Sequence, residues 1–228
     1  TEGIVPANSV RKVYVKHPDA QLRIIIGVGV NEPYTGFTIK GSGQMIIDWG
    51  DNSQLEYIDL SESVEIRVAH WFDNTVDSRR IKIYGEFSVT FINASKIPGA
   101  LLLLKPLSVE EYVSNGNGYS LMGLFLFTDT YIIDLQKCAI SSLMPLAELY
   151  LTELNLNDVR YSSDGVLTEY LQYLAGSETH GTRPACTVRV TGEPTAQAYS
   201  AMDTILAEPS WNTPTPWKFY INNILYTG

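Results

Sequence analysis

Apolar positions in the middle of the chain recur at a spacing of 21 residues. Residues 133–138 (IDLQKC) align with residues 154–159 (LNLNDV). The residues 21 positions earlier place Tyr112 at the first position of this segment and, more weakly, Asn117 at the sixth. A further 21 positions back lies Phe91. A unit of this length cannot bury its apolar face alone, so such units stack on one another and share a core.

The repeated form L-x-L-x-x-C/V is similar to the strand and corner of a leucine-rich repeat. The two Leu-type positions then point inward and the Cys/Val position turns the corner, which predicts a core place for Cys138. We expect the same of Cys186, which precedes a strand-like segment at residues 187–192. Two cysteines are too few for a disulfide framework, so both are expected as buried thiols. Segments 121–124 and 143–146 would line the opposite side. Chance matching among many leucines is the alternative.

The first part of the chain has strand character, broken by turn residues at intervals of about ten residues. The segments with this character are residues 10–16, 22–28, 37–40, 44–49, 64–69, 80–84 and 87–92. Gly, Pro, Asn and Asp lie between them, and Gly41-Ser42-Gly43 is expected to be a turn. No helical period precedes about residue 95. This pattern favours a β-sandwich-like domain over residues 1–92.

The end of the chain combines helical and strand patterns. Apolar residues at a spacing of three to four predict a helix over residues 166–175, stopped by Gly176. A second helix is expected to begin at Pro194, and a last strand covers residues 217–221. This unit would cap a solenoid over residues 93–228. The expected fold class is therefore mainly β with a few helices: a β-sandwich-like domain followed by a short leucine-rich-repeat-type solenoid with an α/β cap.

The sharpest local motif is at residues 46–53 (IIDWGDNS). Apolar residues lead a strand into Trp49, and Gly50 then permits a backbone turn that a β-carbon would hinder. Asp51 and Asn52 can hydrogen-bond their own backbone and hold the turn. Trp49 is expected to be a large, rigid anchor beneath it.

This stretch resembles the I-D-W-G-D-G motif of PKD-like domains and of the bacterial surface proteins called BspA-like. In those proteins a His-Tyr element and a strand ending in I-x-G follow, and here residues 69–72 (AHWF) and 81–85 (IKIYG) occupy those places. The sequence departs from the pattern at Asn52, where Gly is usual, and at Trp71, which follows the histidine. BspA-like proteins place leucine-rich repeats directly after this module. The resemblance implies that a W-G-D structural motif is formed by Asp48, Trp49, Gly50 and Asp51.

The alternative for the motif is a carboxylate pair, Asp48 and Asp51, that binds Ca²⁺ or acts as acid and base. Calcium takes six to eight oxygens, and only Asn52 and Ser53 add to the pair locally. No partner His or Ser motif lies nearby in the sequence, and His70 is expected to be a packed or hydrogen-bonded residue at a strand end. The chain also lacks the G-x-S-x-G, H-E-x-x-H and Walker motifs. We therefore expect no metal, no cofactor and no catalytic residue.

Charge and hydropathy limit the partners. The formal net charge is −9, and neither Arg11-Lys12 nor Arg79-Arg80 grows into a basic stripe, which argues against nucleic acid. No apolar stretch approaches the ~18–20 residues of a membrane span; the densest is residues 100–104. Charged residues make up 18% of the chain, so much of the surface is neutral and polar, which suits contacts with proteins or sugars. The sequence from Thr1 onward has no basic n-region followed by an apolar h-region, so either a signal peptide has been removed or the protein is made in the cytoplasm; the small Thr1 fits the second option.

Contact residues are expected on the flank of the solenoid, at Tyr131 and Tyr150, and in the Trp- and Pro-rich loop at residues 208–217, at Trp211 and Trp217. In the alternative reading of the loop, both tryptophans pack the cap against the solenoid.

These features together predict a non-enzymatic structural or recognition protein of a bacteriophage virion: a tail, baseplate, fibre or capsid-decorating component. Its partners would be other virion proteins, or a receptor or glycan on the host cell surface, with a homo-oligomer as a further option. The first alternative is a secreted BspA-like adhesin at a bacterial cell surface. The second is a glycan-active enzyme that uses the acidic residues of the β module.

Overall fold

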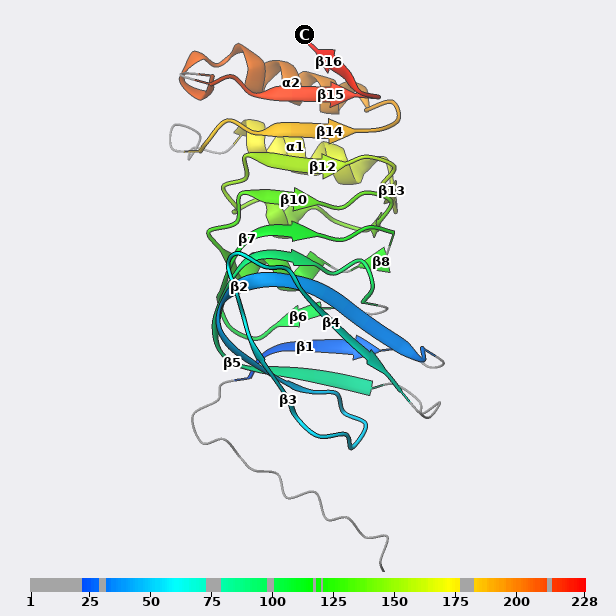
Figure 1. The fold of residues 1–228 in the computed structure, drawn as a ribbon. Coiled ribbons are helices and arrows are strands. Elements are labelled where there is room, and N and C mark those ends of the chain that lie inside the picture. The colour runs from blue at the N-terminus through cyan, green and yellow to red at the C-terminus, as the bar shows by residue number, and fades with distance from the viewer. Residues whose placement is uncertain are drawn as a thin grey trace, which may run out of the picture.

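The chain forms an elongated stack of strands that runs from the N-terminal to the C-terminal part of the protein (Figure 1). The part of the chain that the structure describes is mainly β with two α-helices, as expected for the fold class. The computed structural model describes residues 22–28, 32–72, 79–97, 101–116, 118–119, 121–176, 183–212 and 215–228. The strand expected at residues 10–16 lies outside this set.

Thirteen strands join one mixed sheet, in the order β16-β15-β14-β12-β10-β7-β5-β1-β6; β2 pairs with β3, β4 and β5 off this path, and β9 pairs with β7. The bounds of these strands are β1 (Leu22–Val28), β2 (Tyr34–Asp48), β3 (Glu56–Asp59), β4 (Ile66–Trp71), β5 (Arg79–Asn93), β6 (Leu101–Leu103), β7 (Leu107–Val113), β9 (Phe127–Thr128), β10 (Ile132–Asp134), β12 (Glu153–Leu156), β14 (Thr187–Val190), β15 (Lys218–Ile221) and β16 (Ile224–Tyr226). A second, three-stranded sheet consists of β8 (Gly118–Tyr119), β11 (Ala139–Ile140) and β13 (Arg160–Tyr161).

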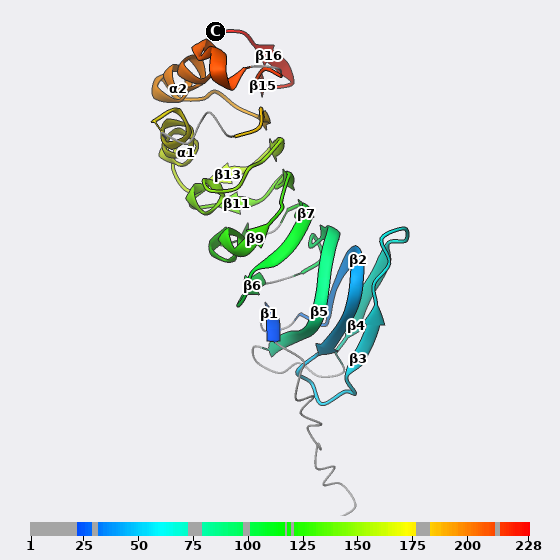
Figure 2. The ribbon, with the colours of Figure 1, turned by 90° about the vertical axis from the view of Figure 1, so that its left-hand side faces the viewer.

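The helices lie behind the large sheet. They are α1 (Gly165–Gly176) and α2 (Ala196–Ala207), with shorter 3₁₀ turns η1 (Leu121–Leu126), η2 (Met144–Leu146) and η4 (Pro209–Trp211). Figure 2 shows β7 and β15 along one side of the stack, α1 and α2 along the other, and β2, β3 and β4 projecting beyond β5. In the described parts of the chain, no helix is long and apolar enough to cross a membrane.

Residues that are 21 positions apart in the sequence lie opposite each other in neighbouring parallel strands. Ile133 lies opposite Tyr112 on one side and opposite Leu154 on the other, as the sequence alignment places them. In the three-stranded sheet, Ala139 lies opposite Arg160 at the same spacing. The inward-facing residues of the successive strands are all buried apolar side chains: Ile92, Tyr112, Ile133, Leu154, Val188 and Phe219.

The alignment fails by one residue at its N-terminal end. Tyr112 lies opposite Ile92, whereas Phe91 lies opposite Glu111 and is only half-buried. Since successive side chains of a strand point to opposite faces, the inward residue of β5 is Ile92. The expected core cysteines are confirmed: Cys138 and Cys186 are buried free thiols.

The turn expected at Gly41-Ser42-Gly43 is wrong, because β2 is continuous over 15 residues. Strand β5 is likewise continuous through Gly85, which separates the expected strand segments 80–84 and 87–92. Residues 37–40 and 44–48 belong to one strand, with a bulge between Lys40 and Gly41. A β-carbon on Gly41 would lie 2.0 Å from the carbonyl oxygen of Ser88, and one on Gly85 would lie 2.2 Å from that of Gln44. These glycines therefore mark close approach of two backbones, the other common reason for glycine in a strand.

The end of the chain follows the expected order with two changes. Helix α1 confirms the pattern over residues 166–175, but α2 begins two residues after Pro194. The reason is Thr195, whose hydroxyl accepts a hydrogen bond from the backbone N–H of Ala198 at 3.1 Å and so caps the helix. Beyond β15, Asn222 and Asn223 have φ of 51° and 65° and turn the chain into β16, which the sequence did not predict.

Candidate binding site and contact surfaces

The W-G-D motif is built into the core of the N-terminal strands. Trp49, which directly follows β2, is 2% exposed. Its indole N–H donates a hydrogen bond to Glu56 of β3 at 2.9 Å. Its ring stacks on His70 of β4, with centroids 4.5 Å apart and planes 12° from parallel. Trp49 therefore links the end of β2 to side chains of β3 and β4.

The turn itself is held by side chains that bind nearby backbone. The N–H of Gly50 donates to Asp48 at 3.0 Å, and the N–H of Ser53 donates to Asp51 at 2.9 Å. Gly50 and Asn52 have φ of 73° and 74°, in the left-handed region. Asparagine tolerates this region better than most residues, which explains how Asn52 replaces the usual glycine.

Asp51 has a second partner that the sequence did not indicate. Strand β4 brings His70 from 19 positions away, so that its Nε2–H donates to the Asp51 carboxylate at 2.7 Å. Burial alone would raise the pKa of Asp51, but hydrogen bonds from Ser53 and His70 outweigh burial and lower it to about 2. No histidine lies near the acidic residues along the sequence, but the fold brings His70 to Asp51, and His70 occupies the hydrogen-bonded place at the end of a strand that was expected of it.

These contacts leave the carboxylates little capacity for other ligands. One oxygen of Asp48 accepts from Gly50, and both oxygens of Asp51 are engaged, one with Ser53 and one with His70. Within the described ranges, no group of three or more His, Cys, Asp and Glu side chains is arranged to hold a metal ion. The geometry of the motif is that of a structural turn.

The four expected contact residues lie in different environments. Tyr131 and Tyr150 are exposed, at 47% and 44%. Trp217 is buried and packs on Phe219, and Trp211 is partly buried against the core. The two tryptophans therefore pack the C-terminal cap onto the strands, which is the alternative given for them above. Of the four residues, only the tyrosines face solvent.

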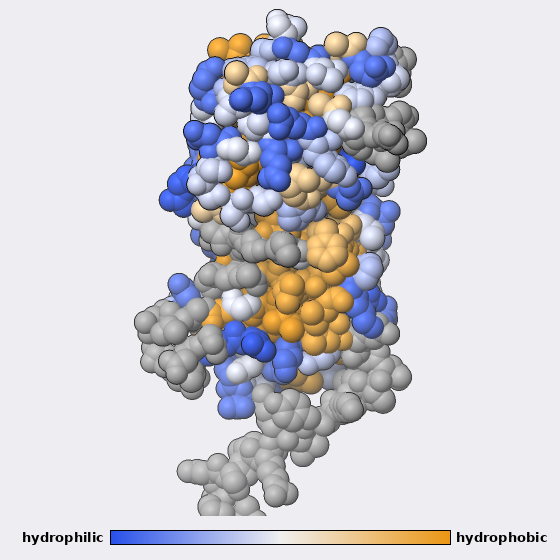
Figure 3. All heavy atoms as spheres, turned by 180° about the vertical axis from the view of Figure 1, so that it is seen from behind, coloured by the Kyte–Doolittle hydropathy of each residue, from blue (hydrophilic) through white to orange (hydrophobic). Residues whose placement is uncertain are grey.

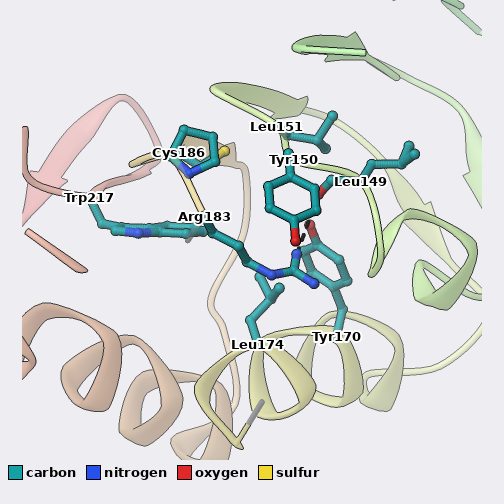
Figure 4. Close-up of a pocket in the computed structure, with 9 residues that line it drawn as sticks. Leu149, Tyr150, Leu151, Tyr170, Leu174, Arg183, Cys186 and Trp217 are labelled. Atoms are coloured by element: carbon teal, nitrogen blue, oxygen red, sulfur yellow. Dashed lines mark hydrogen bonds between the residues drawn. The ribbon is translucent and has the colours of Figure 1, made fainter. Parts of the chain in front are cut away.

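Beside Tyr150 lies a small cavity with a buried arginine (Figure 4). The Arg183 side chain is 5% exposed, donates to the carbonyl of Leu149 at 3.3 Å and lies 5.3 Å from the centre of the Tyr150 ring. Burial raises the pKa of the neighbouring Tyr170 and Cys186. The cavity measures about 10 Å³, the space of one water molecule, so it cannot admit a larger ligand.

An apolar patch occupies the rear face of the molecule (Figure 3). It is formed where β6 contacts η1, and its exposed members are Leu102 (45%), Leu104 (41%) and Phe125 (59%). Leu126 packs partly buried beside them. From the sequence, residues 100–104 were only an apolar run too short for a membrane span. The sequence did not predict an exposed patch there, because which of these side chains face solvent depends on which side of β6 the rest of the chain covers.

A groove of about 450 Å³ lies at the start of β2 and the end of β4. Among the residues that line it are Glu32, Tyr34, Trp71, Ser95, Lys96 and Ile97. Trp71 is 69% exposed, a large fraction for tryptophan. The sequence alone did not indicate this site, and Trp71 entered only as a position where the chain departs from the BspA-like pattern. The available signal was its position in β4, where alternation with the inward His70 and Phe72 turns Trp71 outward.

Comparisons with known proteins give no match: no family model, no characterised protein and no solved structure is similar to this chain. The resemblance to BspA-like and PKD-like proteins therefore rests on the motif residues alone.

Proposed function

We propose that the chain is a non-enzymatic contact protein of a bacteriophage particle, a tail, baseplate, fibre or capsid-decorating component. In this proposal a BspA-like W-G-D module is joined to a short leucine-rich-repeat-type solenoid. The observation that carries the contact role is the apolar patch of Leu102, Leu104 and Phe125. The virion setting rests on the module order and the neutral polar surface predicted from the sequence.

The corners of the parallel strands support a solenoid of repeated units. Gly116, Lys137 and Asp158 all have left-handed backbone, with φ of 84°, 61° and 57°, and are spaced 21 residues apart. Each follows a strand of the large sheet, so the same turn recurs at the same place in each step. For residues 1–92, the β-sandwich-like domain stays part of the proposal, although their described strands are hydrogen-bonded into the large sheet.

The patch has the character of a protein-binding surface. Exposed apolar side chains are ordinary when scattered, but neighbouring ones mark places where another protein packs. Each Å² of apolar surface removed from water contributes about 25 cal/mol, so covering Leu102, Leu104 and Phe125 favours association. The occupant we propose is another protein of the particle, with a second copy of this chain as the other outcome of the test.

The experiment has two arms. Mass spectrometry of purified particles should find the protein, and its absence there would overturn the virion assignment. In the second arm, Phe125→Ser and Leu102→Ser should abolish its recovery in particles, or its self-association in sedimentation velocity. Ile224→Ser is the matched control, because Ile224 is 73% exposed but lies on β16 at the far end of the sheet. Equal behaviour of all three variants would show that the patch is not the contact.

Two other functions remain as weaker proposals. A secreted adhesin is favoured by the order of the W-G-D module and the repeats, and it predicts an export signal in the reading frame upstream of Thr1. A glycan-active enzyme is favoured by the His70–Asp51 contact, and it predicts turnover of a glycan panel that Asp51→Asn abolishes. The enzyme ranks last because both Asp51 oxygens are already engaged.

A further inference from the structure

Tyr34 and Trp71 form an aromatic pair on the outward face of the β2–β4 ladder. They are directly opposite each other in the antiparallel register, with ring centroids 4.8 Å apart and planes inclined by 52°. The neighbours of Trp71 on β4 and beyond, His70 and Phe72, point to the other face and pack together at 4.8 Å. Trp71 is therefore exposed because it lies in a strand whose alternation turns its side chain outward, beside a fixed aromatic neighbour.

The Tyr34 ring is held in one place. It lies across Gly36, since a β-carbon on that glycine would be 2.7 Å from the Tyr34 hydroxyl oxygen. Arg67, on the same face of β4, donates a hydrogen bond to this hydroxyl at 3.3 Å. A surface ordered before binding loses less conformational entropy when a ligand arrives, so the pair is a prepared platform.

Polar and charged residues also line the groove. Ser95 and Lys96 come from the turn after β5, which is fixed to β2 because the Gly36 N–H donates to the Lys96 carbonyl at 3.3 Å. Glu32 completes the rim. The volume of about 450 Å³ lies within the ~300–1,000 Å³ range of small-molecule sites. Among the described residues that line the groove, one cationic and one anionic side chain balance in charge, which favours a neutral ligand.

We propose that this groove binds a neutral saccharide, with the apolar C–H face of one sugar ring stacked on Trp71. Ring hydroxyls would then donate to the Glu32 carboxylate and accept from the Lys96 ammonium. Aromatic side chains supply the flat apolar area, and the charged groups supply directional hydrogen bonds that fix the ring. A mono- or disaccharide fits the volume.

A proline-rich peptide is the main competitor, because it also packs on exposed aromatic rings. Its prolines present carbonyl acceptors but no N–H donors. Such a ligand would satisfy Lys96 and leave the Glu32 carboxylate without a donor. A sugar satisfies both side chains, and for this reason the groove favours the saccharide.

The test uses the full chain on an array of neutral and acidic glycans, followed by calorimetric titration with the neutral glycan of strongest signal. The wild type should bind at least one neutral glycan. Trp71→Ala should weaken that binding tenfold or more, and Lys96→Ala should weaken it less. Phe125→Ala is the matched control, since Phe125 is 59% exposed but lies in the apolar patch at the contact of β6 with η1; it should bind the glycan like the wild type.

Three results would overturn the inference. They are no retention of the chain by any neutral glycan, glycan binding that survives Trp71→Ala, and Trp71-dependent binding of hexaproline in place of a glycan. Circular dichroism checks that each variant is folded, and Trp71→Phe gives a second variant with less volume change. The outcome is independent of the proposed assembly role, because Phe125→Ala or Phe125→Ser disturbs the patch and leaves the groove intact.

Discussion

The imidazole of His70 stacks on the indole of Trp49 at 4.5 Å and at the same time donates its Nε2–H to Asp51 at 2.7 Å. One side chain of β4 thus joins the buried anchor of the W-G-D motif to the turn above it. Glu56 of β3 accepts from the other edge of the indole. The motif is therefore a junction of β2, β3 and β4, and its residues should affect stability before they affect any binding.

The Asp51 contact predicts acid sensitivity. Its pKa in the folded protein, about 2, is below the ordinary value of 3.8, so the ionised form stabilises the fold above about pH 4 and this contribution is lost as the pH falls towards 2. A shift of this size corresponds to at most about 2 kcal/mol. Urea unfolding should show Asp51→Asn less stable than wild type at pH 7, with the gap closing near pH 2. Glu62→Gln, an exposed control, should show no such gap; a gap for Asp51→Asn that is constant with pH would contradict the assignment.

Truncation of Trp49 should lower the stability of the fold far more than truncation of Trp71. Trp49→Ala removes a fully buried ring and should cost about 3–5 kcal/mol. Trp49→Phe keeps an aromatic ring but loses the hydrogen bond to Glu56, so its free energy of unfolding should lie between those of the wild type and Trp49→Ala. Trp71→Ala removes a side chain that is 69% exposed and should change the free energy of unfolding by under about 1 kcal/mol. Denaturant titrations followed by circular dichroism measure all three, and similar losses for Trp49→Ala and Trp71→Ala would show that burial is misassigned.

Two strand glycines give a matched comparison. Gly85 has φ of 121°, and a β-carbon there would lie 2.2 Å from the Gln44 carbonyl oxygen, so Gly85→Ala must force β2 and β5 apart. Gly27 of β1 has no heavy atom within 4 Å of the corresponding position. We expect Gly85→Ala to destabilise by several kcal/mol or to prevent folding, and Gly27→Ala to be neutral or slightly stabilising. Thermal melts of the two variants are sufficient, and tolerance of Gly85→Ala would contradict the close approach.

Several local features follow from the sequence because they depend on neighbours along the chain. The 21-residue spacing predicts that Ile133 lies opposite Leu154, and the period of three to four predicts α1. Both patterns reflect burial of one face of a regular element, which the spacing of apolar residues along the chain predicts.

The groove and the His70–Asp51 contact depend instead on which strands pair and in what register. Tyr34 meets Trp71 only because β2 and β4 are antiparallel in this alignment, and Asp51 meets His70 across 19 positions of the chain. Outside a repeat, single-sequence patterns do not fix the register between separate strands such as β2 and β4. Composition also misled at Gly41, where a glycine that admits a neighbouring backbone has the same appearance as one that turns the chain.

The repeat makes a prediction about the length of a deletion. Removing residues 139–159 excises one 21-residue step, so Arg160 takes the place of Ala139 beside β8 and the strand β10 can pair directly with β14. This variant should fold cooperatively, with lower stability because one buried step is lost. Removing residues 139–158 is the control, since a slip of one residue turns every later side chain to the opposite face of its strand. Circular dichroism and urea unfolding should find the first deletion folded and the second collapsed or aggregated; equal behaviour of the two would contradict the repeat unit.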